Sequence, residues 1–593
     1  MAGAGPLDSS DSLDSSDSSD SSPLSSPPGS PEPSDSSFSP PASEFALLLT
    51  GAEAKDIGAG AKEIGAGAKD MGALTLPLSC YLLAPLYLLQ VLYWGWLLAL
   101  WLLADPDSCF LIGSGRLILE QGITALGGDA FSWTLAQYPG GDYVLYQWLA
   151  SVVFAQISAL AGSTGLIAFG SCLCLLSFVF LPQLVVFVSG QNRAFLGITV
   201  VAVMAFNAAV FHIYLRPELF SFLFLSILLA VFTSFMAPET RLVAGVFGLE
   251  SIRRNSLPLF CTVLFFSLWA NLHTGFVLGL LLLVLNLLAH CLQRVKSGDG
   301  SSGRRPFLPF LVLLGALLGS CLTPYGIKLF AYLPHLFFSK INARVVELTP
   351  LSLPELISSD YLPFTGLSFL ALGSTVWSLS RAKARELLAG SPATYTIAVF
   401  TLTLVGAGFL HRRLVVFAGL TLVYYLLWLV LQGGGRSETR FSLRLQRPII
   451  CFVALPLLAI VGGAALSART FAISLPAQTV GFYPPFAAIE FIRLQRPAGR
   501  LLNDAQYGDV MIERLGPRAQ VFIDTRFDVY GDQLVLDYDK MANGQGNWQE
   551  LLKKYQIDWV FFFEQYKIVR LLRELGWQEV FYKDGAVILK RPG

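Results

Sequence analysis

Charged residues are scarce in this chain: they make up 14% of its 593 residues, where soluble proteins have about a quarter. Hydrophobic residues make up 54%, and the mean hydropathy is +0.58. This composition excludes an ordinary cytosolic enzyme. Lys plus Arg and Asp plus Glu number 41 each, so the net charge indicates neither a nucleic acid nor an acidic partner.

Several common motifs are also missing. The eight cysteines lie outside the polar C-terminal region, so no disulfide framework is predicted, and we interpret them as packing residues. The C-terminal region has no Gly-rich phosphate loop, no Walker motif and no Ser-His-Asp order. These absences argue against a soluble nucleotide-binding or serine-hydrolase domain.

The N-terminal segment has no positive charge, since residues 1–54 contain no Lys, Arg or His. A signal peptide needs such charge, so we expect none here. Residues 1–50 are rich in Ser, Asp and Pro and are predicted to be a disordered tail. Residues 51–74 repeat a seven-residue Gly/Ala/Lys pattern, which we interpret as a linker or a weak interfacial helix.

Long apolar runs fill residues 75–468, and many approach the roughly 20 residues that cross a bilayer. We therefore predict a polytopic α-helical membrane domain of 11–13 helices. Within 146–193, parity fails against an inside N-terminus if both apolar stretches cross, so one of them is predicted to be a juxtamembrane or broken helix. The apolar segments are 76–103, 146–161, 165–188, 194–211, 217–236, 257–270, 275–292, 307–323, 362–380, 392–410, 414–431 and 449–467.

The connecting loops differ in charge, and four of them carry clusters of Arg and Lys, around residues 241–254, 294–305, 381–385 and 436–447. Cytoplasmic loops are enriched in these residues. This pattern predicts a cytoplasmic N-terminus. It places residues 104–146, 324–362 and everything after 468 on the non-cytoplasmic side.

Unusual polar residues gather on that predicted outer side. Ionisable groups at membrane depth are costly, so their concentration on one side indicates a site. Carboxylates there can serve as a base or as metal ligands, and Arg can neutralise phosphate. The candidates are Asp105, Asp107, His212, Arg216, Glu218, Asn271, His273, Glu347, Arg412 and Arg413.

Each candidate also has a structural interpretation. Asp105 and Asp107 could cap a helix that begins in the loop. Arg412 and Arg413 could bind lipid head groups. Asn271 and His273 could satisfy backbone groups in a tight turn, and Glu347 could be a solvated loop acid.

Residues 475–593 alternate short β-branched and aromatic runs with helical spacing, which predicts a small α/β domain. Strands are expected at 500–504, 519–524, 557–563 and 580–591, the last being a hairpin with Asp584-Gly585 at its turn. Helices are expected at 487–494, 548–555 and 565–575. The segment from Asp524 to Asp528 either binds substrate or contains an Arg–Asp pair that fixes a loop.

Several sequence blocks resemble a known group of enzymes. The blocks are Asp105-Pro-Asp107 through Glu120, Gly128-Asp129 through Thr134, Arg216-Pro-Glu-Leu-Phe, Trp269-Ala-Asn-Leu-His-Thr-Gly, Pro324-Tyr-Gly and Phe522 through Tyr530. In this order they resemble GT-C-type membrane glycosyltransferases, and most closely a little-characterised bacterial family of that superfamily. One departure is Ser108, since many GT-C enzymes have an acidic residue directly after the catalytic Asp.

The resemblance implies a reaction and a set of partners. The donor would be a polyprenyl-phosphate sugar lying among membrane lipids, and the acceptor would enter from the outer side. Asp107 or Asp105 would act as the base in an inverting transfer, and Arg216, His273 or Arg412 and Arg413 would hold the phosphate. Some GT-C enzymes use Mg or Mn, so an ion on Asp105 and Asp107 is an option, although no ligand spacing requires one.

Two other functions stay open from the sequence. A transporter or flippase of a lipid-linked precursor would have polar residues along a path through the membrane. A catalytically inactive relative would bind a glycolipid or organise an assembly.

Overall fold

The computed structural model describes residues 105–137, 143–189, 194–236, 257–297, 308–338, 346–380, 392–433 and 484–593. All of them belong to one compact unit, which lies within Pro77–Gly593. The predicted tail, the predicted linker and the apolar segments 76–103 and 449–467 lie outside the described residues, as do most of the basic loops.

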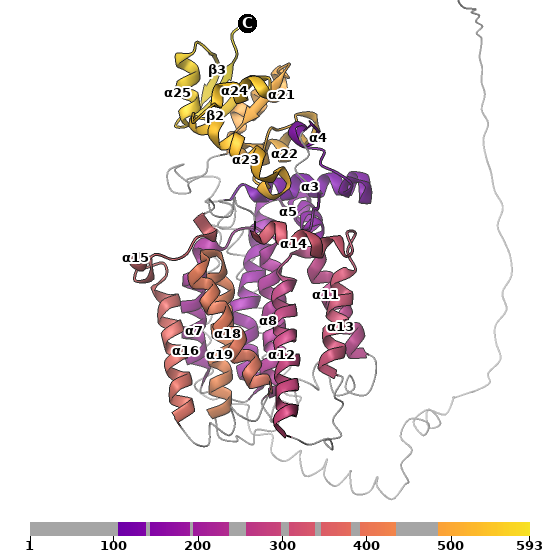
Figure 1. The fold of residues 1–593 in the computed structure, drawn as a ribbon, viewed down its shortest axis with the longest axis vertical. Coiled ribbons are helices and arrows are strands. Elements are labelled where there is room, and N and C mark those ends of the chain that lie inside the picture. Colours follow the sequence, from indigo (N-terminus) through magenta and orange to yellow (C-terminus); the bar gives the residue numbers. More distant parts are fainter. Residues whose placement is uncertain are drawn as a thin grey trace, which may run out of the picture. The chain divides into compact units, whose positions relative to one another are not determined.

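Apolar helices make up most of the described part of residues 148–433 (Figure 1). Among the described residues, five helices are long and apolar enough to cross a membrane, and five shorter apolar helices accompany them. The main helices are α5 (Trp148–Leu175), α6 (Leu181–Val188), α7 (Phe195–Ala209), α8 (Glu218–Met236), α11 (Leu257–Leu272), α12 (Phe276–Ser297), α13 (Leu308–Cys321), α16 (Leu362–Ser380), α18 (Pro392–Leu410) and α19 (Val415–Gly433).

These helices confirm the predicted class, a polytopic α-helical membrane protein with a small C-terminal α/β domain. The expected break within 146–193 is also present. Gly162 has a left-handed φ of 58° and interrupts α5, a conformation that glycine adopts without steric cost. A π-helical turn, Leu176–Phe180, then connects α5 to α6.

The interior of the bundle is packed with aromatic rings. Phe222 of α8 meets Phe178 and the Phe417 ring of α19 edge-on, at centroid distances of 6.1 and 5.0 Å. The Ser226 hydroxyl shares a 2.6 Å hydrogen bond with Tyr424. Polar groups buried in a bilayer must be satisfied within the protein, and this pair meets that need.

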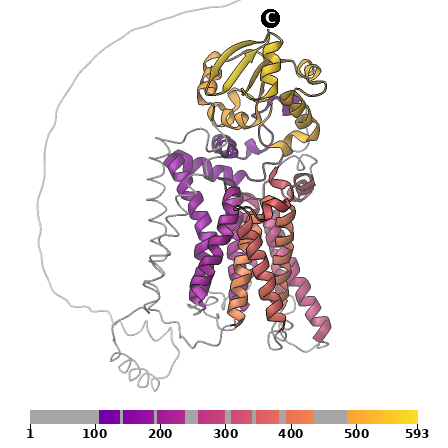
Figure 2. The same cartoon turned by 90° about the vertical axis from the view of Figure 1, so that its left-hand side faces the viewer.

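Short elements cover the end of the bundle at which α7, α11 and α18 finish. They are α3 (Asp107–Gln121), η1 (Gly122–Leu126), α4 (Trp133–Gln137), η4 (Val210–His212), α14 (Lys328–Phe338), η6 (Val346–Leu348), α15 (Leu353–Leu356) and η7 (Arg412–Leu414). The segment of α3 and η1 has the length and hydropathy of a membrane span. The views nevertheless show α3 running across the bundle end rather than along the helices (Figures 1 and 2).

Two glycines bring α3 close to its neighbours. A Cβ at Gly115 would lie 2.0 Å from the carbonyl oxygen of Ser151 in α5. A Cβ at Gly113 would lie 2.9 Å from the carbonyl oxygen of Ile512, in helix α22 (Ala505–Leu515) of the C-terminal domain. Helix α3 is therefore held against the bundle by one glycine and against the C-terminal domain by the other.

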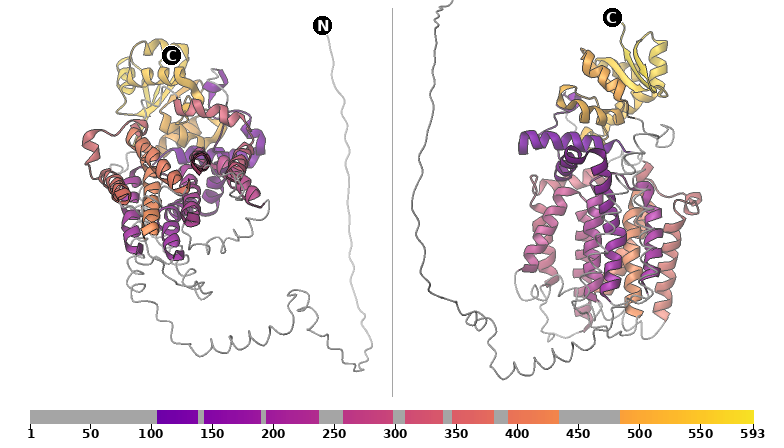
Figure 3. Two further views of the ribbon diagram at one scale, coloured as in Figure 1. Left: turned by 60° about the horizontal axis from the view of Figure 1, so that its bottom comes forward. Right: turned by 180° about the vertical axis from the view of Figure 1, so that it is seen from behind.

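The C-terminal domain contains a four-stranded sheet of order β1-β2-β4-β3 (Figure 3). Strands β1 and β2 are parallel, and the other two pairs are antiparallel. The strands are β1 (Arg500–Asn503), β2 (Ile557–Phe563), β3 (Gln578–Lys583) and β4 (Ala586–Lys590), and the helices are α21 (Phe486–Gln495), α22, η9 (Gly516–Arg518), α23 (Phe527–Asn543), α24 (Trp548–Lys554) and α25 (Lys567–Glu574).

Most of the expected elements of this domain are confirmed, including the hairpin whose turn places Asp584 and Gly585 at φ values of 53° and 78°. The strand expected at 519–524 is wrong. Val521 instead makes an isolated parallel bridge to Ser132, in the segment after α3. A short apolar run has the same sequence pattern whether it pairs as a strand within a sheet or makes a single bridge to a distant segment.

Replacing Gly115 by Ala should loosen α3 from α5, because the added methyl group meets a backbone carbonyl that cannot rotate away. Overpacking of this kind costs about 1–3 kcal/mol, so we expect the melting temperature in detergent to fall by several degrees. The matched control is Gly197→Ala in α7, where a Cβ meets nothing within 4 Å. Equal melting temperatures for the two variants would contradict the close contact.

Candidate functional site

The N-terminus of α3 presents two carboxylates at the bundle end. The Ser108 hydroxyl donates to the carbonyl oxygen of Asp105 (3.0 Å), and the backbone N–H of Cys109 donates to that of Pro106 (2.8 Å). These bonds shape the turn that begins the helix. Pro106 is the N-cap residue and makes no side-chain cap, so the two carboxylates do not act as the helix cap that the structural interpretation proposed.

Both carboxylates instead contact Arg216, which lies in the loop between η4 and α8. The guanidinium donates to Asp105 through two nitrogens, Nε at 2.6 Å and Nη2 at 2.9 Å. Its Nε also lies 3.1 Å from Asp107 Oδ2. A third carboxylate, Glu347 of η6, accepts from Nη1 at 3.1 Å. We call Asp105, Asp107, Arg216 and Glu347 the carboxylate cluster.

The charges of the cluster shift one another's protonation. Burial and the charge of Asp107 raise the pKa of Asp105 to about 7, against the opposing effect of Arg216. Burial alone would raise the pKa of Glu347, but the positive charges around it, that of Arg216 first, together outweigh burial and lower that pKa. Three acids around one cation leave an excess of negative charge, and a neutral Asp105 reduces it.

A second charged pair borders the cluster. The Arg413 guanidinium binds the buried Glu218 carboxylate at the start of α8, with Nη2 at 2.9 Å and Nε at 3.0 Å from Oε2. About a third of the Arg413 side chain is exposed. His212 Nε2 lies 2.8 Å from the Tyr361 hydroxyl, and burial lowers its pKa. The imidazole of His212 is therefore neutral at neutral pH.

Three other predicted site residues have local partners. Asn271 accepts from Trp148 Nε1 and donates to the carbonyl oxygens of Ser267 and Leu322, all at 2.8 Å. Arg412 pairs with Glu355 of α15 at 2.7 Å, away from the carboxylate cluster's contacts. Asn271 thus joins α5 and α11 to the residue that follows α13. Arg412 holds the segment that contains α15.

His273 serves the turn between α11 and α12. Its Nδ1 accepts from the Gly275 backbone N–H at 3.1 Å and lies 2.7 Å from the Ser221 hydroxyl. Burial lowers its pKa to about 3. Without a charge, this imidazole does not provide the fixed cation that the sequence-based hypothesis gave it for phosphate.

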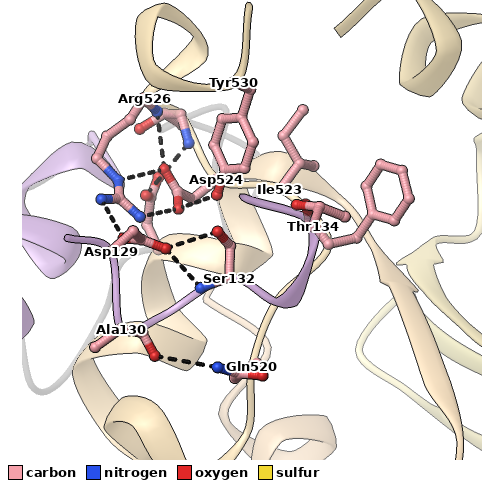
Figure 4. A network of polar contacts seen from close by, with 12 residues as sticks. Asp129, Ala130, Ser132, Thr134, Gln520, Ile523, Asp524, Arg526 and Tyr530 are labelled. Atoms are coloured by element: carbon pink, nitrogen blue, oxygen red, sulfur yellow. Dashed lines mark hydrogen bonds and ion pairs between the residues drawn. The ribbon is translucent and has the colours of Figure 1, made fainter. Parts of the chain in front are cut away.

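A further network, which sequence reasoning described only in part, joins the segment after α3 to the C-terminal domain (Figure 4). Arg526 binds both oxygens of Asp524, at 2.8 and 2.6 Å, and Asp129 Oδ1 at 2.7 Å. The Tyr530 hydroxyl donates to Asp524 at 2.5 Å. The structure thus contains the loop-fixing Arg–Asp pair. Asp129, the second partner of Arg526, belongs to the block from Gly128 to Thr134. The sequence did not predict their contact, because the two residues are 397 positions apart.

A second contact crosses to the same domain. The Tyr332 hydroxyl of α14 donates to Asp528 Oδ2 at 2.5 Å, and burial raises the pKa of Asp528. The rings of Tyr332 and Tyr146 lie 6.1 Å apart. Burial raises the pKa of the Tyr146 hydroxyl, and the charges of Asp528 and Asp107 raise it further.

The cluster does not fit a divalent ion as it is arranged. Both oxygens of Asp105 and one of Asp107 are engaged by the Arg216 guanidinium, and a cation there would have to displace that side chain. Among the described residues no group of three or more His, Cys, Asp and Glu is placed to hold a metal.

No protein-family model and no curated protein sequence matches the chain. Among solved structures, it is similar to the archaeal oligosaccharyltransferase AglB from Archaeoglobus fulgidus, solved in complex with an inhibitory peptide and a dolichol-phosphate. The similarity covers 81% of this chain and 69% of that chain, at 12% sequence identity and a TM-score of 0.45. Likeness at this level is weak and concerns the fold alone.

Replacing Arg216 by Met should destabilise the protein, because it leaves three carboxylates close together without their common cation. Removing one partner of a buried ion pair costs about 3–5 kcal/mol. We expect a lower melting temperature at pH 8 and a smaller loss at pH 5, where protonation relieves the repulsion. Arg573→Met, in an exposed pair with Glu579, is the control and should change little. A loss independent of pH would contradict the electrostatic explanation.

Asp105 should give stability a defined pH dependence. Its folded pKa, about 7, lies above the ordinary value of 3.8, so the folded protein binds this proton more tightly than the unfolded chain. The stability from that proton is complete below pH 4 and is lost as pH rises through about 7. The melting temperature of the native protein, relative to that of Asp105→Asn, should therefore fall as pH rises through this window. A constant difference between pH 4 and 8 would refute the raised pKa.

Proposed function

We propose that this protein transfers a sugar from a polyprenyl-phosphate donor to a hydroxyl acceptor on the non-cytoplasmic side of a membrane. The observation that carries the proposal is the carboxylate cluster, which joins three distant chain segments at one end of a membrane helix bundle. The ordered blocks that resemble the little-characterised bacterial GT-C family supply the reaction class. The four loops rich in Arg and Lys predict that the site faces the non-cytoplasmic side.

Asp107 is the better candidate for the base. Its side chain is 30% exposed and has one contact with Arg216, whereas Asp105 is buried and uses both oxygens on that guanidinium. Asp107 is thus free to reach an acceptor, and Asp105 positions Arg216. A positioned carboxylate that accepts a proton in the transition state contributes about 10²–10⁴-fold to a rate.

The transfer balances as a single displacement at the anomeric carbon. The acceptor oxygen bonds to that carbon on the face opposite the phosphate, and its proton moves to the Asp107 carboxylate. The bond between the anomeric carbon and the phosphate oxygen breaks, and its electron pair leaves with the polyprenyl phosphate. Attack from the opposite face inverts the configuration of the sugar.

The leaving phosphate needs a cation, and Arg413 is the arginine best placed to supply one. Its side chain is partly exposed beside the carboxylate cluster, and Glu218 is its ion-pair partner. Arg216 is occupied by three carboxylates, and Arg412 is held by Glu355. A fixed guanidinium at a developing phosphate charge lowers the barrier without reorganisation.

A second candidate function is binding of a lipid-linked glycan without catalysis. The observation that favours it is that Arg216, Arg412 and Arg413 are each already paired with a carboxylate. A transport function is less well supported, because seven of the described membrane helices have no Asp, Glu, Lys or Arg between their first and last residues. This holds for α7, α8, α11, α13, α16, α18 and α19.

Asp107→Asn should lower the rate of sugar transfer by about 10²-fold or more while the protein remains folded. The measurement is release of polyprenyl phosphate from a set of labelled polyprenyl-phosphate sugars by the purified protein, together with glycan profiles of cells that carry the variant. The matched control is Asp360→Asn, the same change at an acid outside the cluster.

The outcomes separate the candidate functions. Full transfer by Asp107→Asn, with an unchanged glycan profile, would remove the assignment of the base. Donor binding by the native protein without turnover, under every acceptor tried, would favour the non-catalytic alternative.

A further inference from the structure

The C-terminal domain contacts α3 along the face opposite the bundle. Gly113 of α3 meets the backbone of Ile512 in α22, so closely that a Cβ has no room. Asp107 begins this same helix, six residues before Gly113. A rigid helix transmits a displacement along its length, so whatever fixes α3 also fixes the position of the Asp107 carboxylate.

Arg526 contacts both ends of this helical segment. Its guanidinium lies 4.5 Å from the ring centroid of Phe110, in the first turn of α3. Its Nη1 donates to Asp129, beyond the end of η1, at 2.7 Å. The exposed fractions of the Arg526 and Asp129 side chains are 6% and 3%, so solvent screens this ion pair little.

The segment after α3 is also built into the C-terminal domain. Asp129 Oδ2 accepts from the Ser132 backbone N–H and hydroxyl at 2.7 and 2.6 Å, which forms a tight turn. Trp133 then donates from its backbone to Val521, and Thr134 donates from its hydroxyl to Phe522. Asp129 thus lies between α3 and the segment that is hydrogen-bonded to Val521 and Phe522.

We propose that the C-terminal domain positions the Asp107 carboxylate, with Arg526 holding α3 in place through Asp129 and Phe110. Arg526 is a positioning residue and does not contact substrate. The role given to Asp107 rests on the proposed function, whereas the holding of α3 does not. The experiment below separates these two parts.

The test variant is Asp129→Asn, which removes the charge that faces Arg526 and leaves an oxygen for the Ser132 turn. The matched control is Asp537→Asn. The Asp537 side chain is likewise 3% exposed and pairs with Lys554 at 2.8 Å, but it lies wholly within the C-terminal domain. Asp129→Glu retains the charge and should preserve much of the contact.

The first readout is the rate at which N-ethylmaleimide labels Cys109, followed by peptide mass spectrometry of the full-length protein in detergent. Cys109 lies in the first turn of α3, and burial and the Glu513 carboxylate raise its thiol pKa. We expect Asp129→Asn to increase labelling about tenfold, because loss of a buried charge pair favours local opening. Asp537→Asn and Asp129→Glu should stay near the native rate.

The second readout is sugar transfer. A misplaced base should lower kcat by about ten- to a hundredfold and leave the KM for the donor nearly unchanged. Gly113→Ala forces α3 away from α22 without touching the ion pair, and it should give the same two effects. It keeps the test valid if Asp129→Asn fails to fold.

Native labelling of Cys109 in both Asp129→Asn and Gly113→Ala would overturn the proposal. Faster labelling without loss of kcat would retain the holding of α3 and refute the positioning of the Asp107 carboxylate. If the native protein transfers no sugar from any donor, the proposed function fails. Cys109 labelling then still decides whether the C-terminal domain holds α3.

Discussion

The burial of one guanidinium among three carboxylates is the constraint on which the bundle end depends. A charge as poorly exposed as that of Arg216 is tolerated only with close counter-charges. Asp105 and Asp107 come from the start of α3, and Glu347 comes from η6. The loop before α8 therefore holds both segments, and it draws together residues that are 111 and 131 positions apart.

The same constraint decides which groups remain available for chemistry. Asp105 uses both oxygens on Arg216, and Asp107 is the more exposed acid, so Asp107 is the base in the proposed reaction. Arg216, Arg412 and Arg413 are each paired with a carboxylate. His212 and His273 are neutral because burial disfavours their charged forms. Of the three arginines at this end, Arg413 has the most exposed side chain.

Helix α3 connects this chemistry to the C-terminal domain. Gly115 allows contact with α5 and Gly113 allows contact with α22, so the helix is held from two sides. The segment after it shares backbone and side-chain bonds with the region from Val521 to Arg526. The small domain is therefore completed by a segment that precedes most of the membrane bundle in the chain.

The sequence by itself determined the helical membrane class and the ends of most described helices, because apolar length and charged boundaries are local properties. It also placed Asp105, Asp107, Arg216 and Glu347 among the candidates, because they gather with other polar residues on the predicted outer side. It could not separate these four from Asn271 or Arg412, which have similar local patterns. Only the tertiary structure decided that Arg216 is the common partner and that Asp129 meets Arg526. Pairing across more than a hundred residues depends on how helices pack, and no local periodicity records it.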